Sequence, residues 1–535
     1  MSLALVALFA IGQMQMDHGS GHDMHAMLRT GLGNVRHPIT TKNPQAQKFF
    51  NQGLALSYGF NHHAAIAAFQ EAARLDPSSA MAHWGIAYAM GPNINLPIDA
   101  ATNKEAFLEA RAAQGLSGGA SHEESELISA LSMRYNNEDH PNFEELNKAY
   151  AAAMGNVAQH YPNDLDVQTL YAESLMDLQP WRYWSPDGKP LGRIDEIVTI
   201  LQAVLKKDPN HIGANHFLIH ALEASPHPEL ADASAKRLGK LAPQSGHLVH
   251  MPSHIYLRTG RWEEGIKVNQ AALDVDAAFL EKTPNPGVYP MYYIHNFDML
   301  RACADMEGNY KLASWAAQKV SEKAASMGPM GEPFAAVPFL EMTRFAKWKD
   351  VLATPAPASQ MPYVQAVYHY ARGMALATTG DAPGAQKEYD AFADWRSKVP
   401  ADFTWGFTPG SQILDVEANL FSARMARARG DSAGEIDLLR KAVAGYDQIL
   451  YDEPADFFYP VRETLGAALI RVNKHGEAIS VFRDELKLHP NSGRALFGLV
   501  LALKVDGNLL DIEVAQKALQ SSWSHADIPL RLEDF

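Results

Sequence analysis

Histidine side chains gather in one short stretch of the sequence. The chain of 535 residues contains 22 histidines, and seven of them fall between positions 211 and 254, where an even spread would place roughly two. His216 and His220 are four residues apart, and so are His250 and His254. Residues at that spacing project from one face of a helix. Because neutral imidazole is a ligand for zinc, copper and iron, the stretch predicts a transition-metal site.

The two histidine pairs are separated by one repeat length. His216 and His250 are 34 residues apart, and so are His220 and His254. A spacing of this size is typical of helix–turn–helix repeats, so the pairs should occupy matching places on adjacent helices. His247 lies three residues before His250. A proline, Pro252, stands inside the second pair and predicts a displaced helical turn there, which leaves the angle of His247 and His250 open.

Three carboxylates accompany the histidines. Glu223 follows His220 by three residues, and Glu173 and Asp177 lie one helical turn apart in the preceding repeat. Carboxylates beside a metal orient the ligand imidazoles or act as a general base. We therefore predict Glu173, Asp177 and Glu223 as catalytic candidates. The number of ligand groups exceeds what one ion needs, so a two-metal site stays open.

Two other interpretations of the histidines also stay open. Histidines paired with acids can form a hydrogen-bonded polar seam between packed helices, and protonated histidines can bind an anionic ligand. The zinc-protease motif H-E-x-x-H is absent, because Phe217 stands where the motif requires glutamate. The sequence also lacks a G-x-S-x-G elbow, a P-loop and a G-x-G-x-x-G loop.

Proline and glycine divide the chain into helical hairpins. Proline ends one apolar helical stretch and fits the first turn of the next, whereas glycine supplies a left-handed turn between two amphipathic helices. The divisions fall at Pro77, Pro209, Pro490, Gly260, Gly308 and Gly380. Four loops are longer than such hairpins need and are candidates for lids or binding elements. They span 91–99, 179–192, 282–290 and 327–338.

A helix–turn–helix unit that recurs at about 34 residues resembles the tetratricopeptide repeat. The resemblance extends roughly over residues 45–530. The phrases AHWGIAYAMGPNIN, LYAESLMDLQPWRYWSPDG, NHFLIHALEAS and GHLVHMPSHIYLRTGRW are similar to those of a group of bacterial exported tetratricopeptide-repeat proteins of undefined function. This resemblance implies an all-α fold, a right-handed superhelical α-solenoid with long inserted loops, and it implies no known substrate.

The resemblance also implies which residues face the concave groove. In the family's pattern the first helix of each hairpin lines the groove, and this register places both histidine pairs, Glu173 and Asp177 there. His295 begins the next groove helix. The candidate metal ligands are His216, His220, His247, His250, His254 and His295. The candidates for binding a cofactor or ligand are Trp84 and Tyr88, as an aromatic wall, and Arg258, which would hold a carboxylate or phosphate unless it pairs with an acid.

The first thirty residues have a composition of their own. Residues 2–12 form an apolar run that is too short to cross a bilayer and is typical of a signal peptide, although a basic start is missing. Methionines and histidines between positions 14 and 27 suit copper, or they are simply a flexible, polar start. We expect residues 1–30 to precede an N-terminal array (40–352), a linker (353–362) and a C-terminal array (363–535).

Composition excludes several kinds of function. A net charge of −15 argues against nucleic-acid binding, the single cysteine Cys303 excludes an internal disulfide, and no later segment predicts a membrane span. The sequence predicts a periplasmic or secreted metalloprotein with a transition metal in the groove, copper being favoured over zinc or iron. If the protein is an enzyme, its reaction is either hydrolysis or oxidation and depends on the metal. Its ligand in the groove is a small molecule or a peptide. The alternative is a scaffold without enzymatic activity that binds a peptide or protein partner.

Overall fold

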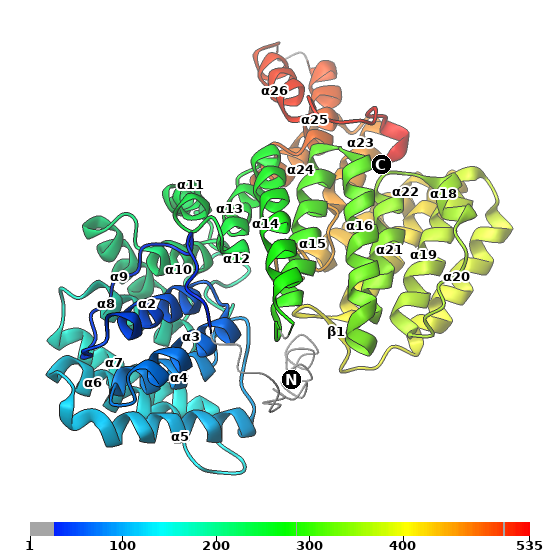
Figure 1. Cartoon of the computed structure of the whole chain (residues 1–535). Helices are drawn as coiled ribbons and strands as arrows, with labels where there is room; N and C mark the ends of the chain where they lie inside the picture. Colours follow the sequence, from blue (N-terminus) through cyan, green and yellow to red (C-terminus); the bar gives the residue numbers. More distant parts are fainter. Residues whose placement is uncertain (1–25, 285, 507–508) are drawn as a thin grey trace. The chain divides into compact units, whose positions relative to one another are not determined.

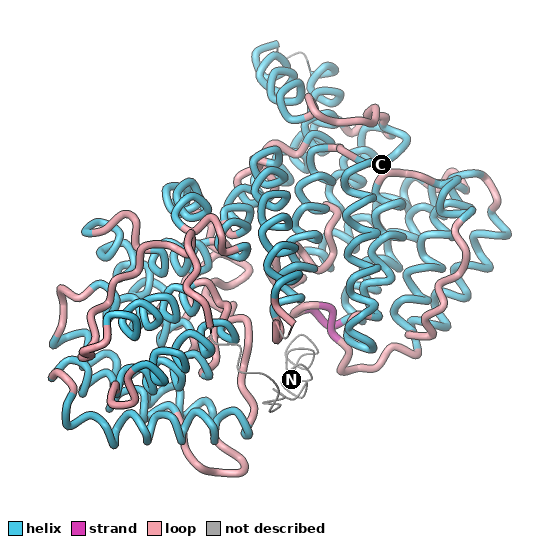
Figure 2. Tube along the Cα trace, viewed as in Figure 1, coloured by secondary structure: helices cyan, strands magenta, loops and turns pink. Residues whose placement is uncertain are grey.

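The protein is described here from a computed structural model, which covers residues 26–284, 286–506 and 509–535. Regular structure in these residues is almost entirely helical (Figures 1 and 2). The chain divides into two compact units. The described part of the N-terminal unit comprises residues 26–255, 271–284 and 286–293, and that of the C-terminal unit comprises 256–270, 294–506 and 509–535. The apolar run at 2–12 and nearly all of the Met/His-rich segment lie outside the described residues.

The N-terminal unit is built from antiparallel helical hairpins. Its helices are α2 (Pro44–Tyr58), α3 (His62–Leu75), α4 (Ala80–Met90), α5 (Ala100–Leu116), α6 (His122–Leu131), α7 (Phe143–His160), α8 (Leu165–Met176), α9 (Ile194–Lys207), α10 (Ile212–Leu222), α11 (Asp232–Leu241) and α12 (Gly246–His250), with 3-10 turns at Ser117–Gly119, Ser132–Arg134 and Pro228–Ala231. Three further helices, α13 (Pro252–Arg258), α14 (Trp262–Lys282) and α15 (Tyr289–Glu307), have residues in both units.

Side-chain caps explain where several of these helices begin. The Asn43 side chain accepts hydrogen bonds from the backbone N–H groups of Gln45 and Ala46, and Pro44 occupies the first turn of α2. Ser121 and Glu124 form a reciprocal capping box at the start of α6. Such caps satisfy backbone donors that have no partner within the helix. The chain therefore stops and restarts its helices at the polar residues that separate the apolar stretches.

Glycine allows the first helices to approach one another closely. The ring of Phe69 on α3 lies between Gly53 of α2 and Gly85 of α4. A Cβ atom at Gly53 would lie 2.6 Å from this ring, and one at Gly85 would lie 2.3 Å from it. Close packing of a core leaves no room to relieve such overlaps without moving a helix. The two glycines and the phenylalanine therefore fix how α2, α3 and α4 stack.

The C-terminal unit continues with the same kind of hairpin. Its helices after α15 are α16 (Tyr310–Ala324), α17 (Val337–Arg344), α18 (Trp348–Ala353), α19 (Pro362–Thr379), α20 (Ala382–Ser397), α21 (Gly410–Ala428), α22 (Ser432–Tyr446), α23 (Val461–Arg471), α24 (His475–Leu488), α25 (Gly493–Asp506) and α26 (Leu509–Ser522), with 3-10 turns at Ala325–Met330, Glu332–Ala336 and Leu532–Asp534. The residues expected as a linker, 353–362, connect α18 to α19 within this unit.

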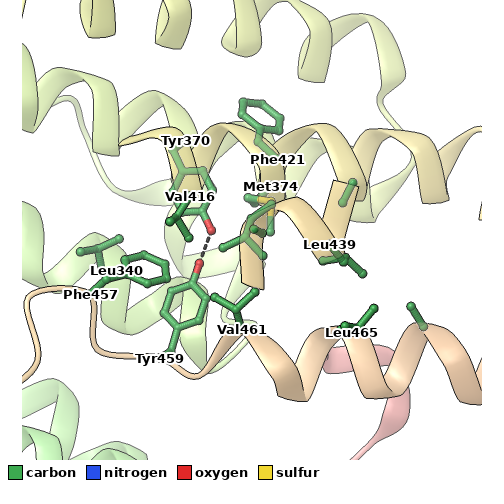
Figure 3. Packing of buried hydrophobic residues seen from close by; sticks show 14 of the residues in the cluster. Leu340, Tyr370, Met374, Val416, Phe421, Leu439, Phe457, Tyr459, Val461 and Leu465 are labelled. Carbon is green, nitrogen blue, oxygen red and sulfur yellow. Dashed lines mark hydrogen bonds between the residues drawn. The ribbon is translucent and has the colours of Figure 1, made fainter. Parts of the chain in front are cut away.

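A short pair of strands is the only sheet among the described residues (Figure 2). Strand β1 (Thr404–Trp405) pairs antiparallel with β2 (Thr408–Pro409) just before α21. The core of the unit includes side chains of α19, α21 and α23, and the hydroxyl groups of Tyr370 and Tyr459 meet in it (Figure 3).

The turn residues predicted from the sequence lie where the helices end. Gly260, Gly308 and Gly380 have φ angles of 69°, 81° and 91°, a left-handed conformation that glycine adopts at no steric cost. Pro77 and Pro209 lie between α3 and α4 and between α9 and α10. The all-α solenoid of helical hairpins is therefore confirmed. None of the helices in the described part of the chain is long and apolar enough to span a bilayer.

Candidate metal centre

Five of the predicted histidine ligands lie together inside the N-terminal unit. His216 and His220 are on α10, His247 and His250 on α12, and His254 on α13. Each of the five is at most 2% exposed, and Glu223, which ends α10, is 1% exposed. The pattern predicted side chains lining a groove, but the structure places them in the interior of the unit. Solvent therefore does not compete for these imidazoles.

One nitrogen of each of three imidazoles is held by an acceptor. His216 Nδ1–H donates to the backbone carbonyl of Tyr58, at 2.7 Å. Glu223 Oε1 accepts from His220 Nδ1 at 2.9 Å, and Glu223 Oε2 lies 2.5 Å from His254 Nδ1 at ion-pair distance. Such partners fix which nitrogen carries the proton. The Nε2 atoms of His216, His220 and His254 are consequently left with lone pairs, as a metal ligand requires.

The Nε2 atoms face other imidazoles. His216 Nε2 lies 3.0 Å from His247 Nε2, and His250 Nε2 lies 2.8 Å from His254 Nε2. Two imidazoles bound to one ion at 2.0–2.1 Å would have nitrogens about 2.9–3.4 Å apart, depending on the coordination angle. One ligand atom from each of His216, His220 and His247 falls within 4.8 Å of the others. Sharing one ion would require the three nitrogens to move closer together and His247 to bind through its unprotonated nitrogen.

His220 Nε2 and His247 Nδ1 have no hydrogen-bond partner among the described residues. In the contact between His247 Nε2 and His216 Nε2, His216 Nε2 is the acceptor, so His247 Nε2 is the donor and carries the proton. A neutral imidazole has one protonated nitrogen, and His247 Nδ1 is therefore an acceptor as well. A buried acceptor without a donor costs about 1–3 kcal/mol. The donor set thus has two lone pairs that a purely hydrogen-bonded seam leaves unused.

The break at Pro252 changes which histidines meet. Helix α12 ends at His250 and α13 begins at Pro252, because proline cannot continue the hydrogen-bond ladder of a helix. His220 still lies against its repeat counterpart His254, with ring centroids 5.8 Å apart. His216 instead meets His247, at 4.9 Å, one turn earlier than its counterpart His250. The displacement expected at this proline is confirmed, and it brings His247 into the cluster.

Burial favours the neutral form of His216, His220 and His247, whereas nearby histidines favour the ionised form of Glu223. Desolvation lowers the pKa of His216 and of His247 well below the ordinary value, and neighbouring histidines lower both further. Desolvation also lowers the pKa of His220, against the opposing charge of Glu223. For Glu223 itself, burial is outweighed by His254 and His220, which bring its pKa to about 2. Neutral imidazole with an ionised carboxylate behind it is the form that binds a metal ion.

Aromatic side chains enclose the cluster. The ring of Phe60, just after α2, lies 4.5 Å from that of His216 and 5.7 Å from that of His220. Trp181, from the long loop 179–192, lies edge-on to His220 at 5.6 Å. Phe60 and Trp181 have φ angles of 54° and 66°. Non-glycine residues adopt this conformation at an energetic cost that is often found at functional sites.

Glu173 and Asp177 lie in a different buried cluster. Arg134 donates through Nη2 to Asp177 Oδ2, and Tyr88 donates to Glu173 at 3.0 Å. Burial, together with the charge of Asp177, raises the pKa of Glu173 to about 8, and burial raises that of Asp177 to about 6. Arg134 was not predicted from the sequence, because it lies in a 3-10 turn that has no defined position in the helix–turn–helix repeat. Two acids with one guanidinium form a site that retains a proton near neutral pH.

Trp84, Tyr88 and Arg258 lie outside the imidazole cluster. Trp84 and Tyr88 stack on each other in the interior, with ring centroids 5.2 Å apart. The guanidinium of Arg258 lies over the ring of Tyr451, at 5.5 Å, within the C-terminal unit. His295 is on α15 and belongs to that same unit. Within the N-terminal unit the candidate site comprises five histidines and Glu223.

A second group of histidine and aspartate lies near the start of the described chain. His37 Nδ1 and His211 Nε2 each lie 3.2 Å from an oxygen of Asp166, and Tyr58 donates to Asp166 at 2.7 Å. Asp164, the cap of α8, is close to His37 and Asp166. Sequence spacing gave no signal for this group, because His37 and Asp166 are 129 residues apart. Its hydrogen bonds join the segment before α2 to α8 and α10.

The fold defines an α-solenoid of stacked helical hairpins. Residues 50–90 match the family model of the tetratricopeptide repeat. They form most of α2 and the whole of α3 and α4. This segment therefore carries a tetratricopeptide repeat. No curated protein matches it.

Several solved structures are similar to the chain at low identity. The Cut9–Hcn1 hetero-tetramer of APC/C is 13% identical, with 87% of this chain and 78% of that chain covered and a TM-score of 0.32. Yeast Tom70 is 12% identical, with 89% and 92% covered and a TM-score of 0.30. The human IFIT1 dimer with m7Gppp-AAAA is 11% identical, with 92% of each chain covered and a TM-score of 0.32. These similarities say nothing about the ligand of this chain.

Proposed function

We propose that the N-terminal unit binds a transition-metal ion through its buried imidazoles. The observation that carries this proposal is the position of Glu223, which holds the Nδ1 atoms of His220 and His254 and so leaves both Nε2 atoms as lone pairs. A carboxylate behind a ligand imidazole is the usual support of a histidine metal site. The unused lone pairs of His220 and His247 favour this interpretation over a structural polar seam.

The proposed ligand set divides into two groups. His216, His220 and His247 supply three nitrogens for one ion, and His250 and His254 face each other as a pair. An all-nitrogen set suits copper, zinc or iron, and the Met/His-rich segment near the N-terminus favours copper. A metal-dependent hydrolytic or oxidative reaction belongs to the same proposal, as does export to the periplasm.

Elemental analysis tests the metal centre directly. The protein is purified without an affinity metal column, dialysed, and analysed by mass spectrometry for copper, zinc and iron. One or two equivalents of a single metal are expected. His216→Ala combined with His254→Ala should remove the metal while helicity, measured by circular dichroism, stays nearly unchanged. The matched control is His122→Ala with His160→Ala, whose side chains are 86% and 63% exposed and which should keep full occupancy.

Two outcomes would overturn the proposal. One is a double variant that keeps all of its metal, which would remove these residues from the site. The other is a folded wild-type protein that is metal-free and refuses added copper, zinc and iron, which would favour the partner-binding scaffold.

A deletion of residues 13–28 separates the N-terminal segment from the interior site. If the segment only delivers copper, the deletion should leave the metal content unchanged. Complete loss of metal would make the segment the main site. Cell fractionation with the first thirty residues kept or removed tests the proposed export.

A further inference from the structure

A second set of metal-ligating side chains lies in the N-terminal unit, apart from the imidazole cluster. His37 precedes α2, and Asp164 and Asp166 lie at the start of α8. One ligand atom from each of the three falls within 4.8 Å of the others. His37 is 4% exposed, and the side chain of Asp166 is 15% exposed. Water therefore reaches this group much less than it reaches acids on an open surface, and a shielded carboxylate needs donors or a cation.

The Asp166 carboxylate is held in one orientation. His211 Nδ1 accepts from the backbone N–H of Ala214 at 3.1 Å. The proton of this imidazole, when it is neutral, is therefore on Nε2, which lies 3.2 Å from Asp166 Oδ1. Tyr58 donates to the same oxygen at 2.7 Å, whereas Oδ2 lies 3.2 Å from His37 Nδ1. Donors behind a carboxylate are the support that metal-binding carboxylates usually have.

The distance between His37 and Asp166 fits two ligands of one ion. Zinc binds imidazole nitrogen at about 2.0–2.1 Å and carboxylate oxygen at about 2.0–2.2 Å, which places the two atoms about 3.0–3.5 Å apart at the usual angles. The observed 3.2 Å lies in this range. Asp164 uses Oδ1 to cap α8, accepting from the N–H of Val167 at 2.8 Å. Its other oxygen is thereby left for a different partner.

Carboxyl groups gather here without a lysine or arginine partner. Those of Asp164 and Glu123 are hydrogen-bonded to each other, which requires a proton on one of them. Within the described ranges, the ion-pair contacts of Glu123, Asp164 and Asp166 are those of Asp166 with two histidines. Lys207 comes near, but it donates to the side chain of Asn163 at 3.0 Å. A divalent cation would replace the shared proton and neutralise these acids.

We propose that His37, Asp164 and Asp166 form a second metal site that binds a divalent ion, zinc in particular. One imidazole with two carboxylates is a nitrogen and oxygen set that zinc accepts, whereas copper(I) prefers sulfur ligands. The ion fastens the segment before α2 to the start of α8. This site is independent of the imidazole cluster, although Tyr58 contacts both, through its hydroxyl at Asp166 and through its carbonyl in the cluster.

Zinc titration of the full chain after treatment with a chelator tests this site. Because the site is more exposed than the imidazole cluster, we expect its zinc to be lost on dialysis and to return on titration. His216→Ala with His254→Ala is the background, and it should take up about one equivalent in competition with a chromophoric chelator. Asp164→Asn keeps the oxygen that caps α8 but loses the carboxylate, and it should lower zinc affinity at least about tenfold. The matched control is Asp99→Asn, at the cap of α5, which should bind zinc as the background does.

Hydrogen exchange of the wild type gives a second measurement, which does not depend on the folding of a variant. Zinc at the proposed site should slow amide exchange in residues 35–43 and 162–170, whereas zinc on the imidazoles should slow it in α10 and α12. His37→Gln should lose the protection of the first two ranges.

Equal zinc affinity in Asp164→Asn and Asp99→Asn would overturn the proposal. So would protection confined to α10 and α12, or a chain that takes up no zinc, since the group would then be a hydrogen-bonded tie alone. Protection confined to residues 35–43 and 162–170 would support this site and count against the metal centre of the imidazoles.

Discussion

The two units bury polar side chains on the inner faces of similar hairpins, but they use different groups. The N-terminal unit gathers five neutral imidazoles around one carboxylate, Glu223. The C-terminal unit gathers guanidinium groups that pair with acids such as Glu463 and Asp305. The buried atoms without a hydrogen-bond partner include His220 Nε2 and His247 Nδ1 in the first unit, and Arg424 Nη1 and both carboxylate oxygens of Glu417 in the second. The same kind of hairpin thus buries mainly neutral imidazoles in one unit and mainly paired ions in the other.

Breaking the ion-pair network should give the largest effect on stability. Arg344→Met leaves Glu463 and Asp305 without a main partner, and removing one member of a buried pair costs about 3–5 kcal/mol. Calorimetry should show a lower melting transition, and hydrogen exchange should place the loss in α17 and α23. The exposed control Arg440→Met, which removes an arginine paired with Glu477, should change the free energy of unfolding by less than about 0.5 kcal/mol. Equal effects of the two variants would contradict the network's role.

A phenylalanine ring packed between two helix glycines should contribute similarly to the stability of both units. Phe482 lies between Gly466 and Gly498, as Phe69 lies between Gly53 and Gly85. A Cβ atom at Gly498 would be 2.1 Å from the Phe482 ring. Gly85→Ala and Gly498→Ala should each lower the free energy of unfolding by about 1–3 kcal/mol through overpacking.

Gly115 on α5 gives the matched control for these two variants, because a Cβ atom there would meet nothing within 4 Å. Gly115→Ala should stabilise by about 0.5–1 kcal/mol, since alanine favours a helix over glycine. Urea unfolding of the three variants measures the difference. Stabilisation by all three would show that the helices separate easily.

Removing the charge of Glu223 should weaken the imidazole site without dismantling it. Glu223→Gln keeps the shape of the side chain but cannot hold two Nδ1–H groups with the same strength. Loss of such a support lowers metal affinity about 10–100-fold. Competition with a chromophoric chelator measures the affinity, and Glu229→Gln, whose side chain is 58% exposed, is the control. Unchanged affinity in Glu223→Gln would mean that the carboxylate does not support the ligands.

The acid pair beside Arg134 should give a smaller effect that depends on pH. The folded pKa of Glu173, about 8, lies above its unfolded value of about 4.3. Between these two values the folded protein holds a proton on Glu173 that the unfolded chain releases. The contribution of this group to the free energy of unfolding is therefore full below about pH 4.3 and is lost as the pH rises through about 8. Glu173→Gln removes this dependence, so the variant should gain stability relative to the wild type between pH 5 and 8.5. Melting curves across that range that run parallel for the two proteins would contradict a raised pKa.

The hairpin architecture follows from local sequence. Proline at Pro77 and Pro209 and glycine at Gly260, Gly308 and Gly380 act within their own turns, so their effect can be predicted without knowing the fold. The histidine pairs follow in the same way, since four-residue spacing is a property of the helix itself. The proposed metal, reaction and export stay predictions, because the fold does not test them.

The burial of the site and its partners was decided only by tertiary structure. The carbonyl of Tyr58 reaches His216 across 158 residues of sequence, and Phe60 covers the imidazoles from the same hairpin. The loop carrying Trp181 encloses His220, and the break at Pro252 exchanges His250 for His247 as the partner of His216. Arg134 likewise carries no sequence signal. Periodicity fixes which face of a helix a residue occupies, but only the packing of distant helices fixes what that face meets and whether water reaches it.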